Sequence, residues 1–405
     1  MAEAPITSLA YGVANFYALF AIQMGASNAV VGWLTSGPAL INFIGVLLLG
    51  RLIQRSRSYI DTLALGAAAH RVLLVMLAGV PLLPAGWRAP ALILLVTLGS
   101  LPATLWGLSF HSSSGEMFSL RHRARLVGQR WAIGNITGMV GLFALGKFLD
   151  AVAFPQNFQL LFVAIGVIGL GSVLLVRRLR MPARTPAHRA ESLFREMTQT
   201  FRDMRHRYQS FARFEAALFL ANFSIFFVAP MFRIFWVRDL GASGTWIGIL
   251  TAVYSVGGML GNLLWGRWSR PNRDRWITLV TLAGLAGMYP LITATFNSLV
   301  PLAGVMFLAG FVAGGNELMI FNRVVQLTPR RERPMYISLH SVAANLAGFI
   351  APLLGAALVD QFGARAMLAA GGCLGAVGAA LVYRFGWGRP PAENEEVAFA
   401  ESGSS

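Results

Sequence analysis

Long apolar stretches separated by short polar loops recur along the whole chain. Each stretch can form a helix that crosses a bilayer, which takes about 20 residues, and a helix satisfies its own backbone hydrogen bonds in lipid. Cutting the chain at charged residues, prolines and turn residues gives twelve segments. They lie near residues 5–23, 28–50, 60–83, 90–115, 127–149, 157–176, 214–237, 244–267, 275–296, 300–322, 335–358 and 364–384. We therefore expect an all-α integral membrane protein with twelve transmembrane helices.

Two of these stretches have nearly the same sequence. Residues 24–63 and 240–279 both begin with an apolar residue followed by Gly-Ala-Ser, and both carry Gly-Arg near the end of the apolar run. A weaker match later in each half aligns Asp150 with Asp360. The second segment thus corresponds to the eighth, which predicts two pseudo-symmetric six-helix bundles in the same orientation, a parallel repeat. The first segment is shorter than its counterpart at the cytoplasmic end, so either this helix is truncated or the true start lies upstream.

Composition agrees with a membrane protein. The chain has 405 residues, of which 56% are hydrophobic and 12% are charged, about half of the charged fraction of an average soluble domain. The formal net charge of +16 comes from arginines in short loops and one central segment, which argues against a nucleic-acid-binding surface. With a single cysteine, Cys373, the sequence excludes an intrachain disulfide and gives no sign of a metal site or cofactor.

The arginines also predict the orientation. Basic residues follow the second, fourth, sixth, eighth and tenth segments, whereas several of the intervening loops have none. By the positive-inside bias these basic loops are cytoplasmic. We therefore expect a multi-pass protein of the cell (inner) membrane with both termini in the cytoplasm.

We predict four regions along the chain. Residues 1–180 form an N-terminal six-helix bundle, and 213–388 form a C-terminal one. Residues 181–212 form a basic amphipathic helix on the cytoplasmic leaflet, or alternatively a solvated linker whose charges only enforce the topology. Residues 389–405 form an acidic, disordered tail.

The loop after the second segment, "GRLIQRSRS", resembles the signature of the major facilitator superfamily, approximately Gly-x-Leu-x-Asp-Arg-x-Gly-Arg-Arg. Gly50, Leu52 and Arg55 match, while Gln54 stands at the acidic position. In the second half, "GRWSRPNRD" keeps the glycine and has Arg270 where the acid would be. The resemblance implies a transporter whose loops gate the path of the solute. The gating candidates are Gly50, Arg51, Arg55, Glu116, Gly266 and Arg267. Glu116 either pairs with an arginine of the first loop or is a solvated charge at the interface.

Polar groups inside the segments are the candidates for chemistry, because hydrocarbon makes them costly. Arg71 is the deepest, about ten residues or 15 Å of helix from either end of the third segment. It either serves function or holds an internal structural partner. Its pseudo-symmetric position in the second half is Gly287.

Glu317 is the only acidic residue that we place clearly inside a segment. The resemblance implies that the first, fourth, seventh and tenth segments line the central cavity, and Glu317 lies in the tenth. It is either a proton carrier, since burial would favour its protonated form, or a fixed partner for a residue such as His340. The other polar cavity candidates are Tyr11, Asn15, Trp106, His111, Asn222, Asn316 and His340. Each could instead make an ordinary interhelical hydrogen bond.

We expect a secondary active transporter of a small solute that works by alternating access, and not an enzyme. No HExxH, GxSxG or Walker lysine motif is present, and each would mark a catalytic or ATP-driven protein. The family resemblance implies export of a drug or metabolite, with the proton gradient as the candidate drive. The internal charges favour a neutral or anionic solute. We expect a monomer in the lipid bilayer that binds no nucleic acid. The alternative is a sensor or scaffold with the transporter fold that moves no solute.

Overall fold

The structure, a computed structural model, describes residues 3–56, 58–117, 120–178, 209–270, 272–329 and 332–388. Within these ranges the chain is helical and contains no strand. Nine of the helices in these ranges are long and apolar enough to cross a membrane. The prediction of an all-α membrane protein is therefore confirmed. The predicted acidic tail and most of the predicted amphipathic linker lie outside the described residues.

The helices of the first half follow the first six predicted segments. A short 3-10 stretch joins two α-helices in the first segment. The elements are α1 (Glu3–Gly12), η1 (Val13–Phe16), α2 (Tyr17–Gln23), α3 (Asn28–Arg55), α4 (Tyr59–Leu77), η2 (Val80–Leu82), α5 (Ala85–Met117), α6 (Leu120–Ala151) and α7 (Gln156–Arg177). Several helices continue past the apolar run that predicted them, because backbone hydrogen bonding does not stop where the hydropathy falls.

The helices of the second half follow the remaining segments, with two π-helical stretches. The elements are α9 (Gln209–Ile234), η3 (Phe235–Asp239), α10 (Gly244–Trp268), α11 (Asp274–Leu282), η4 (Ala283–Met288), α12 (Tyr289–Thr295), α13 (Leu299–Leu327) and α14 (Arg333–Phe385). The stretches η3 and η4 are π-helical. The stretch η4 ends two residues before Pro290, which has no backbone N–H to donate to the preceding turn.

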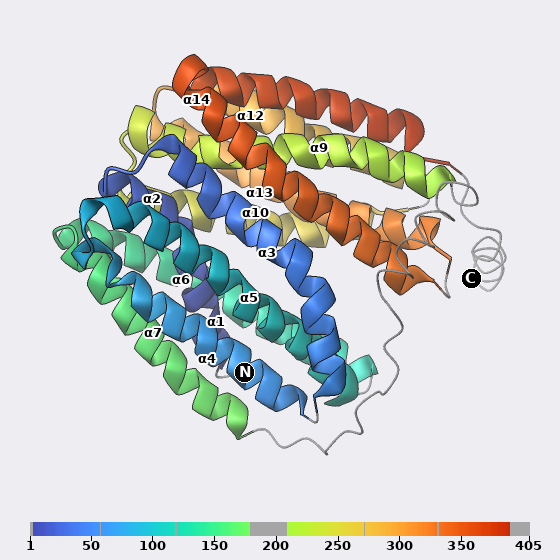
Figure 1. The fold of residues 1–405 in the computed structure, drawn as a ribbon. Helices are drawn as coiled ribbons and strands as arrows, with labels where there is room; N and C mark the ends of the chain where they lie inside the picture. The colour runs from blue at the N-terminus through green and yellow to red at the C-terminus, as the bar shows by residue number, and fades with distance from the viewer. Residues whose placement is uncertain are drawn as a thin grey trace. The chain divides into compact units, whose positions relative to one another are not determined.

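The element α14 contains both of the last two predicted segments. Its backbone is non-helical at Gly363, where φ is +78° and ψ is 155°. Glycine adopts this conformation without a steric penalty because it has no Cβ. Figure 1 shows the two runs, orange and then red, which meet near the label α14. The predicted boundary between the eleventh and twelfth segments falls within a few residues of this break.

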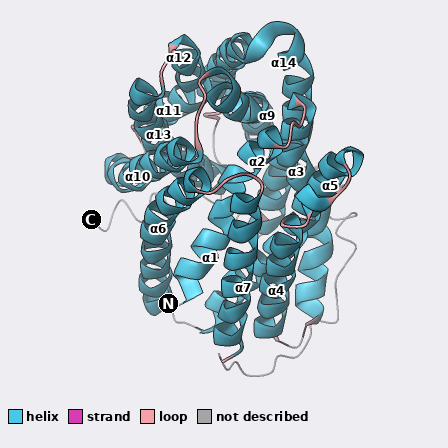
Figure 2. Cartoon of the chain, turned by 90° about the vertical axis from the view of Figure 1, so that its left-hand side faces the viewer, coloured by secondary structure: helices cyan, strands magenta, loops and turns pink. Residues whose placement is uncertain are grey.

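The chain divides into two compact units (Figure 1). Unit 1 comprises Met1–Ala190 and Arg233–Val253, and unit 2 comprises Glu191–Phe232 and Tyr254–Ser405. In unit 1, α4 packs against α5 and α7, α3 packs against α5, and α1 packs against α6 and α7. Figure 2 shows α1 beside these last two helices. The predicted division of the chain at residues 181–212 stays a prediction.

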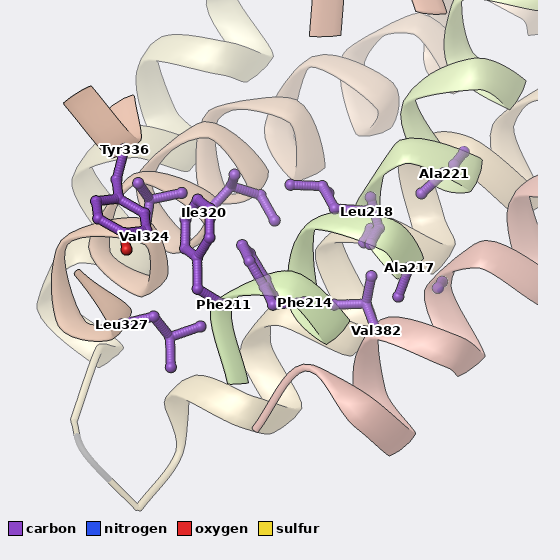
Figure 3. Packing of buried hydrophobic residues seen from close by; sticks show 13 residues of the cluster. Phe211, Phe214, Ala217, Leu218, Ala221, Ile320, Val324, Leu327, Tyr336 and Val382 are labelled. Atoms are coloured by element: carbon purple, nitrogen blue, oxygen red, sulfur yellow. The ribbon is translucent and has the colours of Figure 1, made fainter. Parts of the chain in front are cut away.

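The core of unit 2 is a cluster of apolar side chains from α9, α11, η4, α13 and α14 (Figure 3). Phe211 and Tyr336 meet edge to face in this cluster, with ring centroids 5.0 Å apart. Elsewhere in unit 2, α10 and α13 touch backbone to backbone. A Cβ placed on Gly310 would lie only 1.9 Å from the carbonyl oxygen of Tyr254. Small residues permit this close approach, and the resulting van der Waals packing contributes to helix association in lipid.

The hairpin 233–253 is fixed within unit 1 by a carboxylate at the start of α10. Asp150 Oδ1 accepts a hydrogen bond from the Gly244 N–H (2.7 Å), and Oδ2 accepts one from the Thr245 N–H (2.8 Å). Burial raises the pKa of this carboxyl, but hydrogen bonds from Thr245, Ser243 and Gly244 outweigh it, so the pKa lies below its usual value. Asp150 follows the fifth predicted segment and caps the positive end of the α10 dipole.

Candidate functional site

Arg71 lies at the centre of a polar cluster in unit 1. It extends from α4, and its side chain is fully buried at 0% exposure. Its Nη1 donates to Nδ1 of His70 (3.1 Å), and its Nη2 donates to Oγ1 of Thr7 on α1 (3.3 Å). Room for the side chain comes from Gly169 on α7, where a Cβ would lie 2.7 Å from the Arg71 Cγ. The acceptors that the described residues offer to this guanidinium, a hydroxyl and an imidazole nitrogen, carry no negative charge.

Aromatic rings cover the same cluster on the side of α1 and α5. The Arg71 guanidinium lies 5.1 Å from the ring centroid of Tyr11. The Tyr11 ring in turn lies 4.7 Å from His70 and 5.5 Å from Trp106. The Trp106 Nε1 is buried and has no hydrogen-bond partner among the described residues. Two of the predicted cavity residues, Tyr11 and Trp106, are thus brought together with Arg71.

An ion pair at the start of α1 continues the cluster. The Thr7 hydroxyl donates to Glu3 Oε1 (2.6 Å), and Arg130 Nη2 on α6 donates to Glu3 Oε2 (3.1 Å). The Arg130 guanidinium also covers the rings of Phe110 and Trp106, at 4.2 and 5.1 Å from their centroids. Sequence reasoning missed both members of this pair. Glu3 precedes the first predicted segment, and Arg130 lies so near the start of the fifth that it resembles the loop arginines.

Asn15, in η1, makes a separate polar contact within unit 1. Its Nδ2 donates to the Gly12 carbonyl (2.9 Å), and its Oδ1 accepts from Nη2 of Arg233 (3.1 Å). The Arg233 guanidinium lies 5.0 Å from the ring centroid of Trp236. Arg233 is also absent from the sequence-based candidates, although it lies within the seventh predicted segment. A charged residue inside an apolar run was the available signal.

The structure places the acidic residues of unit 2 differently from the sequence-based hypothesis. Nδ1 of His340 lies 3.1 Å from Oε2 of Glu215, whose residue exposure is only 8%. The suggested partnership of His340 with Glu317 is therefore wrong, and Glu317 is not the only acid inside the helices. Glu215 is the second residue of the predicted segment 214–237 and so resembles a charge at the helix end, whereas α9 begins at Gln209, about a turn and a half earlier. Glu317, on α13, has an exposed side chain.

The remaining candidates do not join these clusters. Asn316 is buried on α13, and its Oδ1 has no hydrogen-bond partner among the described residues. Asn222 is half-buried on α9. Gly266 and Arg267 are exposed near the end of α10. The side chains that lie outside the described part are those of His111 and of the gating candidates Arg51, Arg55 and Glu116, and the surroundings of Gly50 are likewise not described.

Comparison with known proteins identifies the fold. The sequence model described as Major Facilitator Superfamily matches residues 214–404. No curated protein matches the chain. Among solved structures, the fold is similar to that of the nucleoside transporter NupG, with a TM-score of 0.74 and 11% identity over 95% of this chain and 99% of that one.

Two further transporters have a similar fold. One is the xylose transporter XylE from E. coli in an inward-open conformation, with a TM-score of 0.71 and 13% identity over 98% of both chains. The other is a bacterial homologue of the human lysosomal transporter Spinster, with a TM-score of 0.68 and 13% identity over 95% of this chain and 94% of that one. Residues 214–404 are thus similar in sequence to the Major Facilitator Superfamily, and the chain as a whole has the fold of these transporters.

Proposed function

We propose that the protein is a secondary active transporter that moves a small solute across the membrane by alternating access. The observation that carries this proposal is the polar cluster of unit 1, in which Arg71, Tyr11 and Trp106 meet inside helices of membrane-spanning length. A protein that only anchors or scaffolds has no need for charges and an unpaired hydrogen-bond donor at this depth.

Energetics support a functional reason for the cluster. Burial of a guanidinium costs several kcal/mol unless an anion compensates it, and among the described residues the hydrogen-bond partners of Arg71 are His70 and Thr7. The fold itself does not require this arginine, because Gly287 occupies the pseudo-symmetric position. In addition, α1 and α5 are the first and fourth predicted segments, which the family resemblance assigns to the solute cavity. We therefore assign solute binding in unit 1 to this cluster.

We further propose that transport is coupled to protons through Glu317. No hydrogen bond or ion pair to this carboxylate is found among the described residues, so it is available to exchange a proton. Glu215 is the rival carrier, but its carboxylate already contacts His340 (3.1 Å). Export of a drug or a metabolite, which the family resemblance implies, stays a prediction.

Flux into proteoliposomes tests both parts of the proposal. Uridine and xylose are suitable probes, because structures with this fold are named as nucleoside and xylose transporters, and benzoate adds an anion. We expect an imposed pH gradient to drive accumulation of at least one probe. If none of the three probes crosses the membrane although the protein is correctly inserted, the transport proposal is refuted and the sensor or scaffold alternative is supported.

The variant Glu317→Gln separates coupling from transport. It should abolish accumulation against a gradient while exchange of the solute down its own gradient continues. Glu332→Gln is the matched control, since it removes an exposed acid just before α14 and should leave both activities unchanged. If Glu317→Gln still concentrates the probe, the proton-carrier role is wrong. If only Glu215→Gln stops accumulation, the role belongs to Glu215.

A further inference from the structure

We propose that Arg130 is the anchor for the carboxylate of a small organic anion, and that the solute displaces Glu3 from it. This inference rests on the proposed transport function and names the class of solute. It concerns two residues that the sequence did not single out, on α1 and α6 of unit 1. The solute class follows from three properties of the site: free hydrogen-bond donors, an uncompensated charge and an aromatic support.

Arg130 has donors to spare. A guanidinium carries five N–H donors, and the described bonds to Glu3 all come from Nη2, at 3.3 Å to Oε1 and 3.1 Å to Oε2. Within the described part of the chain no acceptor is found for Nε or Nη1. The pair is also reachable, with side-chain exposures of 13% for Arg130 and 17% for Glu3, whereas Arg71 is sealed at 0%. A second carboxylate can therefore reach Arg130 but cannot reach Arg71.

The charges of the cluster do not balance. Arg71 and Arg130 carry two positive charges, and Glu3 carries the one negative charge bonded into the same network. His70 contributes no negative charge in either protonation state. Among the described residues one positive charge of this network thus has no counter-ion, which is costly for a charge buried in protein. A solute with one negative charge completes the balance, while a cation is repelled and a neutral solute leaves the deficit in place.

The aromatic side chains determine how the anion is held. Trp106 and Phe110 are stacked, with centroids 5.5 Å apart and an interplanar angle of 7°. The Arg130 guanidinium lies over both rings, so its position is set from one side by cation–π contacts. Such contacts use the face of the guanidinium and leave its N–H edge for a planar, two-oxygen acceptor. A carboxylate matches that edge better than a hydroxyl or an amide does.

Glu3 occupies one edge of Arg130 and therefore competes with the solute. Its Oε1 also accepts the Thr7 hydroxyl, which in turn accepts from Arg71. When a carboxylate replaces Glu3, the ion pair between α1 and α6 is lost while the link from Glu3 to Thr7 can persist. We therefore expect opposite effects on carboxylate binding: removal of the Arg130 charge should weaken it, and removal of the Glu3 charge should strengthen it. A purely structural ion pair would lose stability whichever member is removed, and neither loss would depend on solute.

The test is ligand-induced thermal stabilisation of the full-length purified protein, which needs no transport. The probes are benzoate and hexanoate, each compared with its own amide, benzamide and hexanamide. We expect the carboxylates to raise the melting temperature and the amides to have little effect. Arg130→Gln should raise the apparent Kd for the carboxylates about tenfold or more, because a charge-assisted hydrogen-bonded pair is lost. The affinity of Arg130→Lys for the carboxylates should lie between those of wild type and Arg130→Gln, because lysine keeps the positive charge but cannot donate two parallel hydrogen bonds.

Glu3→Gln should strengthen carboxylate binding several-fold, because it removes the competing charge and keeps an acceptor for Thr7. Arg273→Gln is the matched control, since it removes an exposed positive charge at the start of α11 in unit 2, and it should bind like wild type. The proposal is overturned if neither carboxylate stabilises the wild type, if Arg130→Gln binds as well as Arg273→Gln does, or if Glu3→Gln weakens binding. Should Arg130→Gln fail to fold, Glu3→Gln and Arg130→Lys still decide.

Failure of this inference and failure of the proposed function give different results. Flux of uridine or xylose without any effect of the carboxylates retains the transporter and overturns the anion site. Binding of carboxylates that depends on Arg130, with no flux of any probe, retains the anion site and overturns transport.

Discussion

Replacement of Gly66 by alanine tests the close approach of α4 to α5. A methyl group at Gly66 would lie 2.7 Å from the carbonyl oxygen of Pro102 and 2.8 Å from the backbone nitrogen of Trp106. Ordinary contacts begin near 3.4 Å, so the two helices must separate by roughly 0.7 Å to relieve the overlap. Both obstructing atoms belong to the backbone and cannot rotate away. We expect a loss of about 1–3 kcal/mol in the free energy of unfolding, the usual cost of overpacking.

The same displacement should reach the polar cluster. Trp106 supports the Arg130 guanidinium and contacts the Tyr11 ring, so a shift of its backbone should weaken solute binding as well as stability. Gly107→Ala is the matched control, since Gly107 is the next residue of α5 and a Cβ there meets nothing within 4 Å. It should be neutral or slightly stabilising, because alanine favours the helix. Thermal unfolding in detergent measures both variants. Equal melting temperatures for the two would refute the close contact between the helices.

Three further predictions test other parts of the chain. Asp150→Asn should lower the melting temperature at neutral pH. The pKa of the Asp150 carboxyl is lower in the folded protein than the ordinary value of 3.8. The ionised carboxylate therefore stabilises the fold above pH 3.8, and this contribution is lost as the pH falls through the folded pKa. The difference in melting temperature between wild type and variant should disappear in that acidic range. A cysteine introduced at Gln156 in a cysteine-free background should react with an impermeant thiol reagent from outside the cell and one at Thr198 should not, and the reverse would reject the predicted orientation. Arg323→Gln should increase hydrogen exchange near the end of α14, because Arg323 donates to the carbonyl oxygens of Gly386 (2.9 Å) and Gly388 (2.7 Å), and unchanged exchange would contradict this anchoring role.

The helices could be predicted from the sequence, because their signal is local. Uninterrupted apolar runs bounded by arginines and turn residues located the helices to within a few residues, and the internal repeat indicated the family fold. The break at Gly363 was found for the same reason, since a gap in hydropathy marks a change of direction. The full length of helices such as α6, which begins at Leu120, is harder to predict, because a polar sequence can continue a helix beyond the lipid.

The partners of the buried polar groups could not be predicted in this way. Glu3 and Arg130 are 127 residues apart, and Glu215 and His340 are 125 apart. Which side chains meet across such a separation depends on the rotation of each helix about its axis and on its vertical position, and neither is encoded in hydropathy. The depth of Arg71 could be read from its own segment, but Thr7 and Gly169, which make its burial possible, lie on two other helices.

The backbone contact of α10 with α13 has a consequence for how this protein tolerates sequence change. Every replacement of glycine by another amino acid adds at least one heavy atom, and at Gly310 or Gly257 that atom would meet a carbonyl oxygen of the facing helix at 1.9 or 2.1 Å. A library of random variants should therefore be depleted at these positions as severely as at a ligand-binding residue. The two kinds of position differ in the substitution they reject. The glycines reject even alanine, whereas an arginine that holds a solute rejects the loss of its charge.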